Sequence, residues 1–323
     1  MSKKFGIISY PDSRNKGDEI QSIAAGRQLP QVDYLVPRSG VNTFESKNNE
    51  EVNLICNGWF TTDKTAWPPS NVINPLFVSF HASHYKGADA EIISEKYIPF
   101  YKKNEPIGCR DYDTKAKLEK IGIKAFFSGC ITLTLDNPFG EDVERDEILI
   151  VEPFIMFKYN QKYVDYCLDI LVPEKYRSKV KLISHWRDKG DATTIDGKFK
   201  ESEALLDRYA KAKLVITSRI HCALPCLAMG TPVYFMDMGY NSDVDRNRFK
   251  GIIDLFNVID DSYFPMNKNT YLNYVLRGLG LYKFYKRNKE TIAIDWENPK
   301  PNPVKYKEYR ENIKKLVKEF IEK

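Results

Sequence analysis

The strongest constraint on the fold is a regular alternation of short apolar runs with segments of helical periodicity. Apolar runs of this length, bounded by turn residues, are typical of buried strands. Strands that alternate with helices predict a mostly parallel sheet that is covered on both faces. The predicted strands are Phe5–Ser9, Val32–Val36, Val52–Cys56, Leu76–Phe80, Pro106–Cys109, Lys124–Phe127, Glu147–Val151, Val180–Ser184, Leu214–Ile216 and Pro232–Phe235.

The predicted helices fall between and after these strands. In the segment Asp113–Ile121, Asp113 is expected to cap the helix and Gly122 to end it. A last helix is expected to start with Asn302 as its cap and Pro303 in its first turn. The other predicted helices are one that ends near Gln28, Ala90–Phe100, Gln161–Leu171, Ser202–Ala210, one over Ala223–Ala228, and Arg246–Phe256.

An acidic stretch at residues 136–142, with one proline and one glycine, interrupts this alternation. A chain of 323 residues is also too long for one small core. We therefore predict an N-terminal domain over residues 1–138, a second domain over 139–262, and a basic, aromatic helical segment over 263–323 that packs back on both. The expected fold is α/β, with two Rossmann-like domains facing each other across a cleft and braced by C-terminal helices.

Composition is that of a globular protein. The hydrophobic fraction is 42%, which is usual for packed domains. No segment approaches the roughly 20 apolar residues of a membrane span, and the first residues carry too short an apolar run for a signal peptide. The six cysteines show no paired spacing, and we interpret Cys222 and Cys226 as small core residues. These features favour reduced thiols and a cytoplasmic location.

The formal net charge of +5 is unevenly distributed. Residues 266–323 contain 14 basic and 7 acidic side chains and therefore carry +7, whereas the preceding part carries −2. Several tyrosines and a phenylalanine interleave with these basic residues. Such a mixture suits nucleic acid or an anionic membrane surface. A pair of C-terminal helices with solvated lysines explains it as well, and that is the interpretation we favour.

The stretch 213–235 is the clearest candidate for a functional site. It combines a short strand, a polar turn with Ser218, Arg219 and His221, a helix, and a second strand. In open α/β sheets ligands bind at the carboxyl edge, where such a turn lies. An ordinary crossover in which Arg219 and His221 only cap the helix would have the same local sequence. The stretch 213–235 alone does not decide between a ligand-binding turn and an ordinary crossover.

Polar residues also follow other predicted strands, and in the expected fold these clusters converge on one cleft. A turn glycine and a helix cap explain the glycine and aspartate of the first cluster in full, and that is the interpretation we favour for these two residues. The histidine pair of the third cluster lacks a third ligand nearby, so we predict no metal site. The clusters are Asn15, Gly17 and Asp18; Asn57 with Gly58 and Trp59; His81 and His84; Arg110; and His185.

The ordered set of these motifs resembles the polysaccharide pyruvyl transferase family. The resemblance covers residues 5 to about 240 and rests on the order of the blocks rather than on any one of them. The segment Asn57–Phe60 stands where many members carry a glycine-rich run, as it does in one branch of the family. The blocks are Asn15-x-Gly17-Asp18, Cys109-Arg110-Asp111-x-x-Thr114, Phe127-Ser-Gly-Cys130, and Ser218-Arg219-x-His221 followed by Gly230-x-Pro232.

The resemblance implies a GT-B-like fold and transfer of a pyruvyl group from phosphoenolpyruvate to two hydroxyls of a sugar. The product would be a cyclic ketal in a polysaccharide or its precursor, with phosphate released and no metal or organic cofactor required. The family associates the positions of Arg110, Arg219 and His221 with phosphoenolpyruvate. The second domain is then the donor side and the first the acceptor side. The acceptor would be a sugar or a lipid-linked oligosaccharide, and no nucleic-acid partner is expected. The basic tail leaves peripheral contact with a membrane open.

The chemistry of these side chains agrees with that implication. Guanidinium groups bind carboxylates and phosphates bidentately, so Arg110 and Arg219, with Ser218 beside them, would clamp phosphoenolpyruvate across the cleft. His221 would serve as the general acid/base. Asp18 would orient the acceptor hydroxyl or only cap its helix. The remaining acceptor or cleft candidates are Asn15, Gly17, Asn57, His81 and His185.

Two other functions fit the sequence. A GT-B glycosyltransferase that uses a nucleotide sugar would share the fold and the cleft, but it needs a Glu or Asp in the second domain to hold a ribose. The loops we can identify there offer Arg and His instead. A non-catalytic homologue that binds glycans or anions, with the basic tail carrying the function, is the second alternative.

Overall fold

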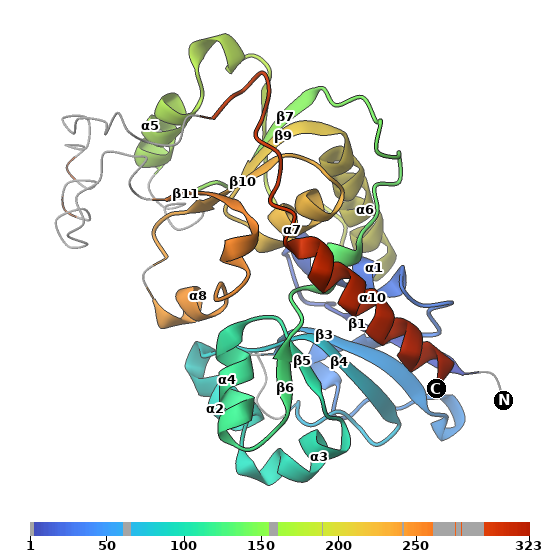
Figure 1. Ribbon diagram of the computed structural model, residues 1–323. Helices are drawn as coiled ribbons and strands as arrows, with labels where there is room; N and C mark the ends of the chain where they lie inside the picture. Colours follow the sequence, from blue (N-terminus) through green and yellow to red (C-terminus); the bar gives the residue numbers. More distant parts are fainter. Residues whose placement is uncertain are drawn as a thin grey trace.

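The computed structural model describes residues 3–60, 66–154, 161–188, 190–240, 242–260, 275, 279 and 294–323. Within them, two parallel β-sheets follow one another along the chain, each with helices on its faces (Figure 1). The first sheet and its helices form the lower part of the molecule in this view, and the second sheet forms the upper part. The predicted α/β fold with two Rossmann-like units is therefore confirmed.

The first sheet has the strand order β2-β1-β3-β4-β5-β6. Strands β3 and β4 run further than predicted, because a register shift between Cys56 and Gly58 lets β3 continue beside β4. As a consequence Asn57 and His81 lie within strands and not in the loops after them. The strands are β1 (Lys4–Ser9), β2 (Tyr34–Pro37), β3 (Val52–Phe60), β4 (Ile73–Ala82), β5 (Ile107–Cys109) and β6 (Ala125–Phe127).

Helices cover both faces of the first sheet. The apolar residues of α1 (Lys16–Gly26) pack on one face, and α2 (Ala88–Ile92), α3 (Ile98–Lys103) and α4 (Tyr112–Lys120) cover the other. The single helix predicted for Ala90–Phe100 is wrong. Ser94 is extended and a proline stands in the first turn of α3, and since proline has no N–H to donate, a new helix starts there.

The second sheet has the order β11-β10-β9-β7-β8, again with parallel neighbours. Helix α5 covers one face, and α6 and α7 cover the other. The bounds of β7 and α5 are those predicted. The elements are β7 (Glu147–Val151), α5 (Gln161–Leu171), β8 (Val180–Ile183), α6 (Ile195–Lys211), β9 (Ala212–Thr217), α7 (Ile220–Ala228), β10 (Val233–Asp237), α8 (Asp243–Asn247) and β11 (Asn257–Asp260).

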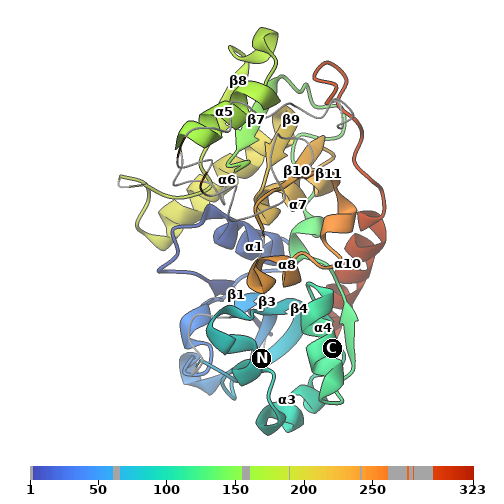
Figure 2. The same cartoon turned by 90° about the vertical axis from the view of Figure 1, so that its left-hand side faces the viewer.

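One apolar core joins the two sheets. It includes residues of β1, β3 and β4, residues of β7, β9 and β10, and the helices α1, α6 and α7 between them. Figure 2 shows α1 lying between the two halves of the molecule. The carboxyl edges of the two sheets meet there, because the loop after β1 contacts both the loop after β8 and the start of α7.

The last helix, α10 (Tyr306–Glu322), braces both halves. Its Arg310 donates to the carbonyl oxygen of Ala228 at the end of α7, and near its other end the Ile321 carbonyl accepts from Lys3 Nζ at 2.7 Å. Ile313 and Val317 of this helix enter the shared core. The predicted bracing role is thus confirmed for α10. The aromatic stretch 266–293 lies outside the described residues except for 275 and 279, and the domain limits stay a prediction.

Two predicted caps are wrong. Asp111, not Asp113, caps α4, because its carboxylate accepts the Thr114 amide at 2.8 Å. The Asn302 amide instead binds the backbone of Thr231 and Val233 ahead of β10, and α10 begins only at Tyr306.

The predicted helix Arg246–Phe256 is also wrong. Gly251 has φ +88°, a left-handed backbone that ends helical structure, and the chain then forms a short 3₁₀ turn and β11.

Candidate active site

The turn after β1 is organised by Asn15. Its side-chain oxygen accepts the Gly17 amide at 3.2 Å and so caps α1, a role that we had assigned to Asp18. The Asp18 carboxylate is buried and accepts from Ser13 Oγ at 2.5 Å and Asn15 Nδ2 at 3.3 Å. Burial raises the pKa of Asp18, because a charged carboxylate is poorly solvated there.

Gly17 allows this turn to contact the second sheet. A Cβ atom at Gly17 would lie 2.9 Å from His185 Cε1 and 2.9 Å from His221 Cβ. His185 follows β8, its Nδ1 lies 3.3 Å from Asn15 Oδ1, and its carbonyl oxygen accepts the Lys16 amide at 2.9 Å. The pKa of His185 is held well below its ordinary value by burial and by Arg219. These contacts bring four of the candidate residues together from both sheets.

His221 lies in the first turn of α7. Its Nε2 atom is buried and has no hydrogen-bond partner among the described residues. Burial lowers the pKa of His221 well below its ordinary value, and the charges of Arg110, Arg248 and Arg219 add to this, together with His185. The imidazole is therefore neutral in the free protein and lies close to positive charge from both sheets.

Arg110 is the cation that the first sheet contributes. It directly follows β5, is 2% exposed, and its backbone amide donates to the Phe80 carbonyl oxygen at 2.9 Å. Its Nε has no hydrogen-bond partner, and no carboxylate pairs with its guanidinium among the described residues. A buried charge without a counterion is costly, so this side chain is suited to hold an anionic ligand.

Arg219 is held differently. Its Nε donates to the Glu152 carboxylate, and its guanidinium carbon lies 5.8 Å from the centre of the Trp186 ring. Glu152 has φ +43°, an uncommon left-handed backbone for this residue type. The Ser218 hydroxyl donates to the Glu152 carbonyl oxygen. Ser218 therefore orients the loop that carries Arg219, and its hydroxyl is already engaged.

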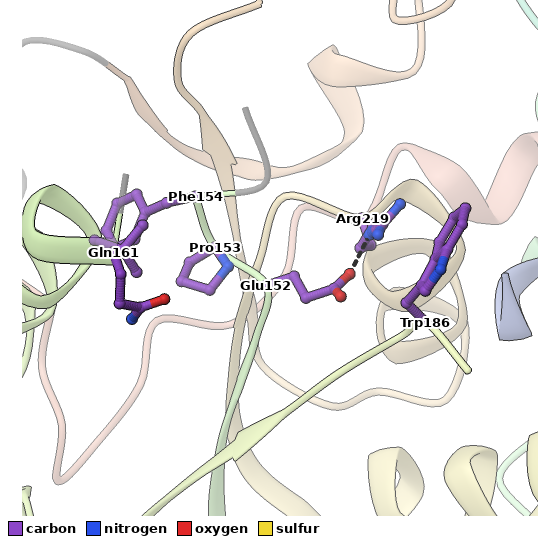
Figure 3. A pocket seen from close by; sticks show the side chains of 7 residues that line it. Glu152, Pro153, Phe154, Gln161, Trp186 and Arg219 are labelled. Atoms are coloured by element: carbon purple, nitrogen blue, oxygen red, sulfur yellow. Dashed lines mark hydrogen bonds and ion pairs between the residues drawn. The ribbon is translucent and has the colours of Figure 1, made fainter. Parts of the chain in front are cut away.

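A cavity of about 290 Å³ opens beside Arg219 (Figure 3). Glu152 and Arg219 face each other at one side, with the Trp186 indole next to Arg219. The remaining lining residues are Pro153, Phe154, Gln161 and Val164.

On the first sheet, His81 lies within a hydrogen-bonded pair. Its Nδ1 is 2.5 Å from the Asp111 carboxylate and 3.2 Å from Thr114 Oγ1, and both His81 and Asp111 are almost fully buried. Burial and the nearby Arg110 lower the pKa of His81, although Asp111 opposes them. Asn57 is also fully buried, and both its amide atoms lack partners among the described residues.

A comparison with protein-family models decides the relationship. The model described as polysaccharide pyruvyl transferase matches residues 15–240, which is more than half of the chain. The chain belongs to the polysaccharide pyruvyl transferase family. The family suspected from the ordered motifs is thus confirmed, and the match contains Asn15, Arg110, Arg219 and His221.

Sequence comparison of this pyruvyl transferase family member with functionally curated proteins gives no match. Among solved structures, an uncharacterized protein from Klebsiella pneumoniae is 12% identical, with 80% of this chain and 92% of that chain covered and a TM-score of 0.45. A proposed UDP-N-acetylglucosamine 2-epimerase from Listeria monocytogenes is 13% identical over 90% and 89%, with a TM-score of 0.40. The E. coli ADP-heptose lipopolysaccharide heptosyltransferase II is 9% identical over 87% and 98%, with a TM-score of 0.26.

Sequence reasoning missed Arg248 in this family member. Its guanidinium lies over the rings of Phe249, Tyr240 and Trp59, at 4.7, 5.5 and 5.8 Å from their centres. Burial lowers the pKa of Arg248, and Arg110 and Arg219 lower it further. It lies beyond the family match and inside a segment predicted to be helix, so no strand-end motif indicated it.

Glu152 was missed as well, although its position directly after β7 is a signal that the sequence contains.

Across the described residues, no group of three or more His, Cys, Asp and Glu side chains is arranged to hold a metal ion. None of the described helices combines the length and the apolar character that a bilayer crossing requires.

Proposed function

We propose that this family member transfers the pyruvyl group of phosphoenolpyruvate to two hydroxyls of a sugar in a polysaccharide or its precursor, forming a cyclic ketal and releasing phosphate. The observation that carries the proposal is the set of arginines around His221. Arg110 comes from the first sheet, and Arg219 and Arg248 come from the second, and the charge of each lowers the pKa of that imidazole. Phosphoenolpyruvate presents a carboxylate and a phosphate, the two groups that guanidinium forks bind best.

The three arginines have different environments. Arg110 has no carboxylate partner among the described residues, whereas Arg219 is paired with Glu152 and Arg248 with Asp245 at 3.5 Å. An anion bound between the sheets would therefore relieve the uncompensated charge of Arg110 most. We assign Arg110 as the principal anion ligand, with Arg219 and Arg248 completing the clamp.

His221 would deliver the proton that the reaction requires. The methylene carbon C3 of phosphoenolpyruvate must become a methyl group so that C2 gains positive character and a hydroxyl can attack it. In the free protein burial, together with the charges of the arginines, lowers the pKa of His221 and keeps the imidazole neutral. The bound anion would offset those charges and raise the pKa of His221, so that the imidazole takes up a proton and can donate it to C3.

The nucleotide-sugar alternative gains one observation from the structure. Contrary to our expectation for the second unit, a glutamate, Glu152, lies directly after β7 and lines the cavity of Figure 3. Its carboxylate accepts from Arg219 and from Ser184 Oγ. Binding of a ribose would have to displace these donors, so we favour the anion clamp over the glycosyltransferase function.

Ligand-induced heat stabilisation separates these functions. Phosphoenolpyruvate should raise the melting temperature of the wild-type protein, and UDP-glucose should not. Arg110→Lys should weaken phosphoenolpyruvate binding about tenfold or more, since it loses a charged hydrogen bond worth about 1.5–3 kcal/mol. Arg246→Lys is the matched control, because Arg246 is paired with Asp237 and half exposed.

Stabilisation by UDP-glucose alone would contradict the proposal. Stabilisation by phosphoenolpyruvate without phosphate release in the presence of methyl glycosides of glucose, galactose, mannose and N-acetylmannosamine would favour the non-catalytic homologue.

A further inference from the structure

Burial lowers the pKa of two imidazoles, His81 in β4 and His221 at the start of α7, and the charges of Arg110 and Arg248 lower the pKa of each further. The two histidines differ in their hydrogen-bond partners. The Trp59 ring lies 6.2 Å from the His81 ring, and the Arg248 guanidinium lies 5.8 Å from the same Trp59 ring. Arg110 is fixed to β4 through the carbonyl of Phe80, the residue before His81. His81 has a carboxylate partner in Asp111, whereas His221 has none among the described residues.

The Asp111 carboxylate is held rigidly. One oxygen accepts the Thr114 amide at 2.8 Å as the cap of α4, and the other faces His81 Nδ1 at 2.5 Å. Although burial opposes it, His81, Arg110 and the Thr114 amide lower the pKa of Asp111 below its ordinary value, so this carboxylate is ionised. An ionised carboxylate only accepts hydrogen bonds. The proton of neutral His81 therefore sits on Nδ1, and Nε2 carries the lone pair.

The Nε2 atom of His81 is buried and has no hydrogen-bond partner among the described residues. Buried polar atoms are nearly always satisfied, and the exceptions call for an explanation. A buried histidine with a purely structural role usually has hydrogen-bond partners for both ring nitrogens. Here Nδ1 is fixed by Asp111 and Thr114, while the basic nitrogen is left for a donor that the described residues do not supply.

We propose that His81 Nε2 accepts the proton of the attacking sugar hydroxyl, with Asp111 as its positioning residue. The inference rests on the proposed pyruvyl transfer and adds a second proton-transfer group to it. The imidazolium that forms would be stabilised by the Asp111 carboxylate, as a carboxylate does for the histidine in a hydrolase triad. His221, without a carboxylate and surrounded by arginines, loses its proton readily and is suited to be the acid.

Ketal formation breaks the C2–O bond to phosphate and forms two C2–O bonds to the sugar. The first hydroxyl oxygen bonds to C2 while its proton passes to His81, and His221 gives a proton to C3. The C2–O bond to phosphate then breaks, and the phosphate leaves with the electron pair. The second hydroxyl oxygen bonds to C2 and closes the ketal. Of the two hydroxyl protons, one replaces the proton lost by His221 and the other leaves with the phosphate.

Measuring the turnover of His81→Gln tests directly whether His81 acts as the general base. Phosphate release from phosphoenolpyruvate is measured with the methyl glycoside, among those named above, that the wild-type protein uses best. We expect kcat to fall about 10²–10⁴-fold, the usual contribution of general acid–base catalysis, with heat stabilisation by phosphoenolpyruvate unchanged. His84→Gln is the matched control, because His84 also pairs with a carboxylate, Asp89, but its side chain is 53% exposed. It should keep wild-type turnover.

The dependence of kcat on pH should show the titration of His81 and its coupling to Asp111. Protonation of His81 removes the base, so kcat falls at low pH. Burial and the arginines lower the pKa of His81, and Asp111 raises it. Asp111→Asn keeps a capping side chain but removes that carboxylate, so kcat should drop and its low-pH limb should move to lower pH. The groups that face His81 are Asp111, which caps α4, Thr114 of α4, Arg110 after β5, Trp59 of β3 and Arg248 after α8.

The tautomer of His81 can be measured without any acceptor. The chain has four histidines, so a ¹⁵N spectrum of the imidazoles can be assigned by single substitutions. We expect His81 as the Nδ1–H tautomer, a changed pattern in Asp111→Asn, and no change in the control Asp113→Asn, which alters a neighbouring carboxylate paired with Lys117.

A spectrum that shows His81 protonated on Nε2 would overturn the inference. Turnover of His81→Gln within about threefold of wild type would also overturn it, because loss of a general base lowers turnover far more. Neither result would contradict pyruvyl transfer itself. A wild-type protein that phosphoenolpyruvate does not stabilise would refute the proposed function itself.

Discussion

Replacing Glu19 by glutamine should change how the stability of the protein depends on pH. Glu19 lies in the first turn of α1, is 2% exposed, and is paired with Arg187 Nη1 at 2.9 Å across the junction of the two sheets. Burial raises the pKa of Glu19 to about 7, even though Arg187 lowers it. Desolvation of the carboxylate therefore outweighs the attraction of its partner.

The size of the effect follows from that pKa. A carboxyl group whose pKa is raised on folding stabilises the folded state below the unfolded pKa and loses this contribution as the pH rises through the folded one. For Glu19 the window extends from 4.5 to about 7. Each tenfold change in proton affinity is worth about 1.4 kcal/mol, so the wild-type protein loses about 3 kcal/mol across the window. Glutamine does not ionise and avoids this loss.

Urea unfolding of both proteins at several pH values measures the difference. Arg187 keeps Glu201 at 2.9 Å as a partner in the variant. The free energy of unfolding of Glu19→Gln should equal that of wild type near pH 4, below the window, and exceed it by about 3 kcal/mol near pH 8. Glu203→Gln, which alters an exposed ion pair with Arg27, should follow wild type within about 1 kcal/mol. A Glu19→Gln variant that is less stable than wild type near pH 8 would refute the reasoning, since the ion pair would then dominate.

Two further predictions concern the junction and the clamp. Gly17→Ala should lower turnover about 100-fold by displacing His185 and His221, whose nearest atoms a Cβ would meet at 2.9 Å. Gly26→Ala in the same helix, where the nearest atom lies at 3.5 Å, should keep turnover; equal losses in both variants would contradict this. Phosphoenolpyruvate should bind more tightly as pH falls, because binding raises the pKa of His221 and takes up a proton. Calorimetry in buffers of different ionisation enthalpy should detect this proton uptake in wild type but not in His221→Asn. Identical uptake in both proteins would mean that a group other than His221 takes up the proton.

The sequence predicts most of the fold because its strands are apolar runs with clear ends. The bounds of β7 and α5 were predicted correctly for this reason. β11 has only four residues, of which Asn257 and Asp260 are polar, and it forms because β10 offers its edge. Helix starts were less predictable, because Asp111 and Asp113 both qualify as a cap by residue type and only tertiary structure selects Asp111.

The site is predictable where a functional side chain lies between the end of a strand and the first turn of the next helix. Arg110 directly follows β5, and Arg219 and His221 lie at the start of α7 after β9. Arg248 reaches the junction from the loop after α8, and its position depends on which rings it packs against, so no local pattern reveals it. The pairing of His81 with Asp111 joins a residue of β4 to the cap of α4, 30 positions apart in the sequence, and the alignment of β4 with β5 brings them together.

The central claim, that a pyruvyl group is transferred as a ketal, is tested most directly by running the reaction in D₂O and analysing the sugar product by mass spectrometry and NMR. The account predicts a cyclic ketal whose methyl group carries one deuterium from solvent, with one phosphate released per product. A product that keeps the methylene group of an enolpyruvyl ether, or a sugar that gains a second sugar in place of pyruvate, would contradict it.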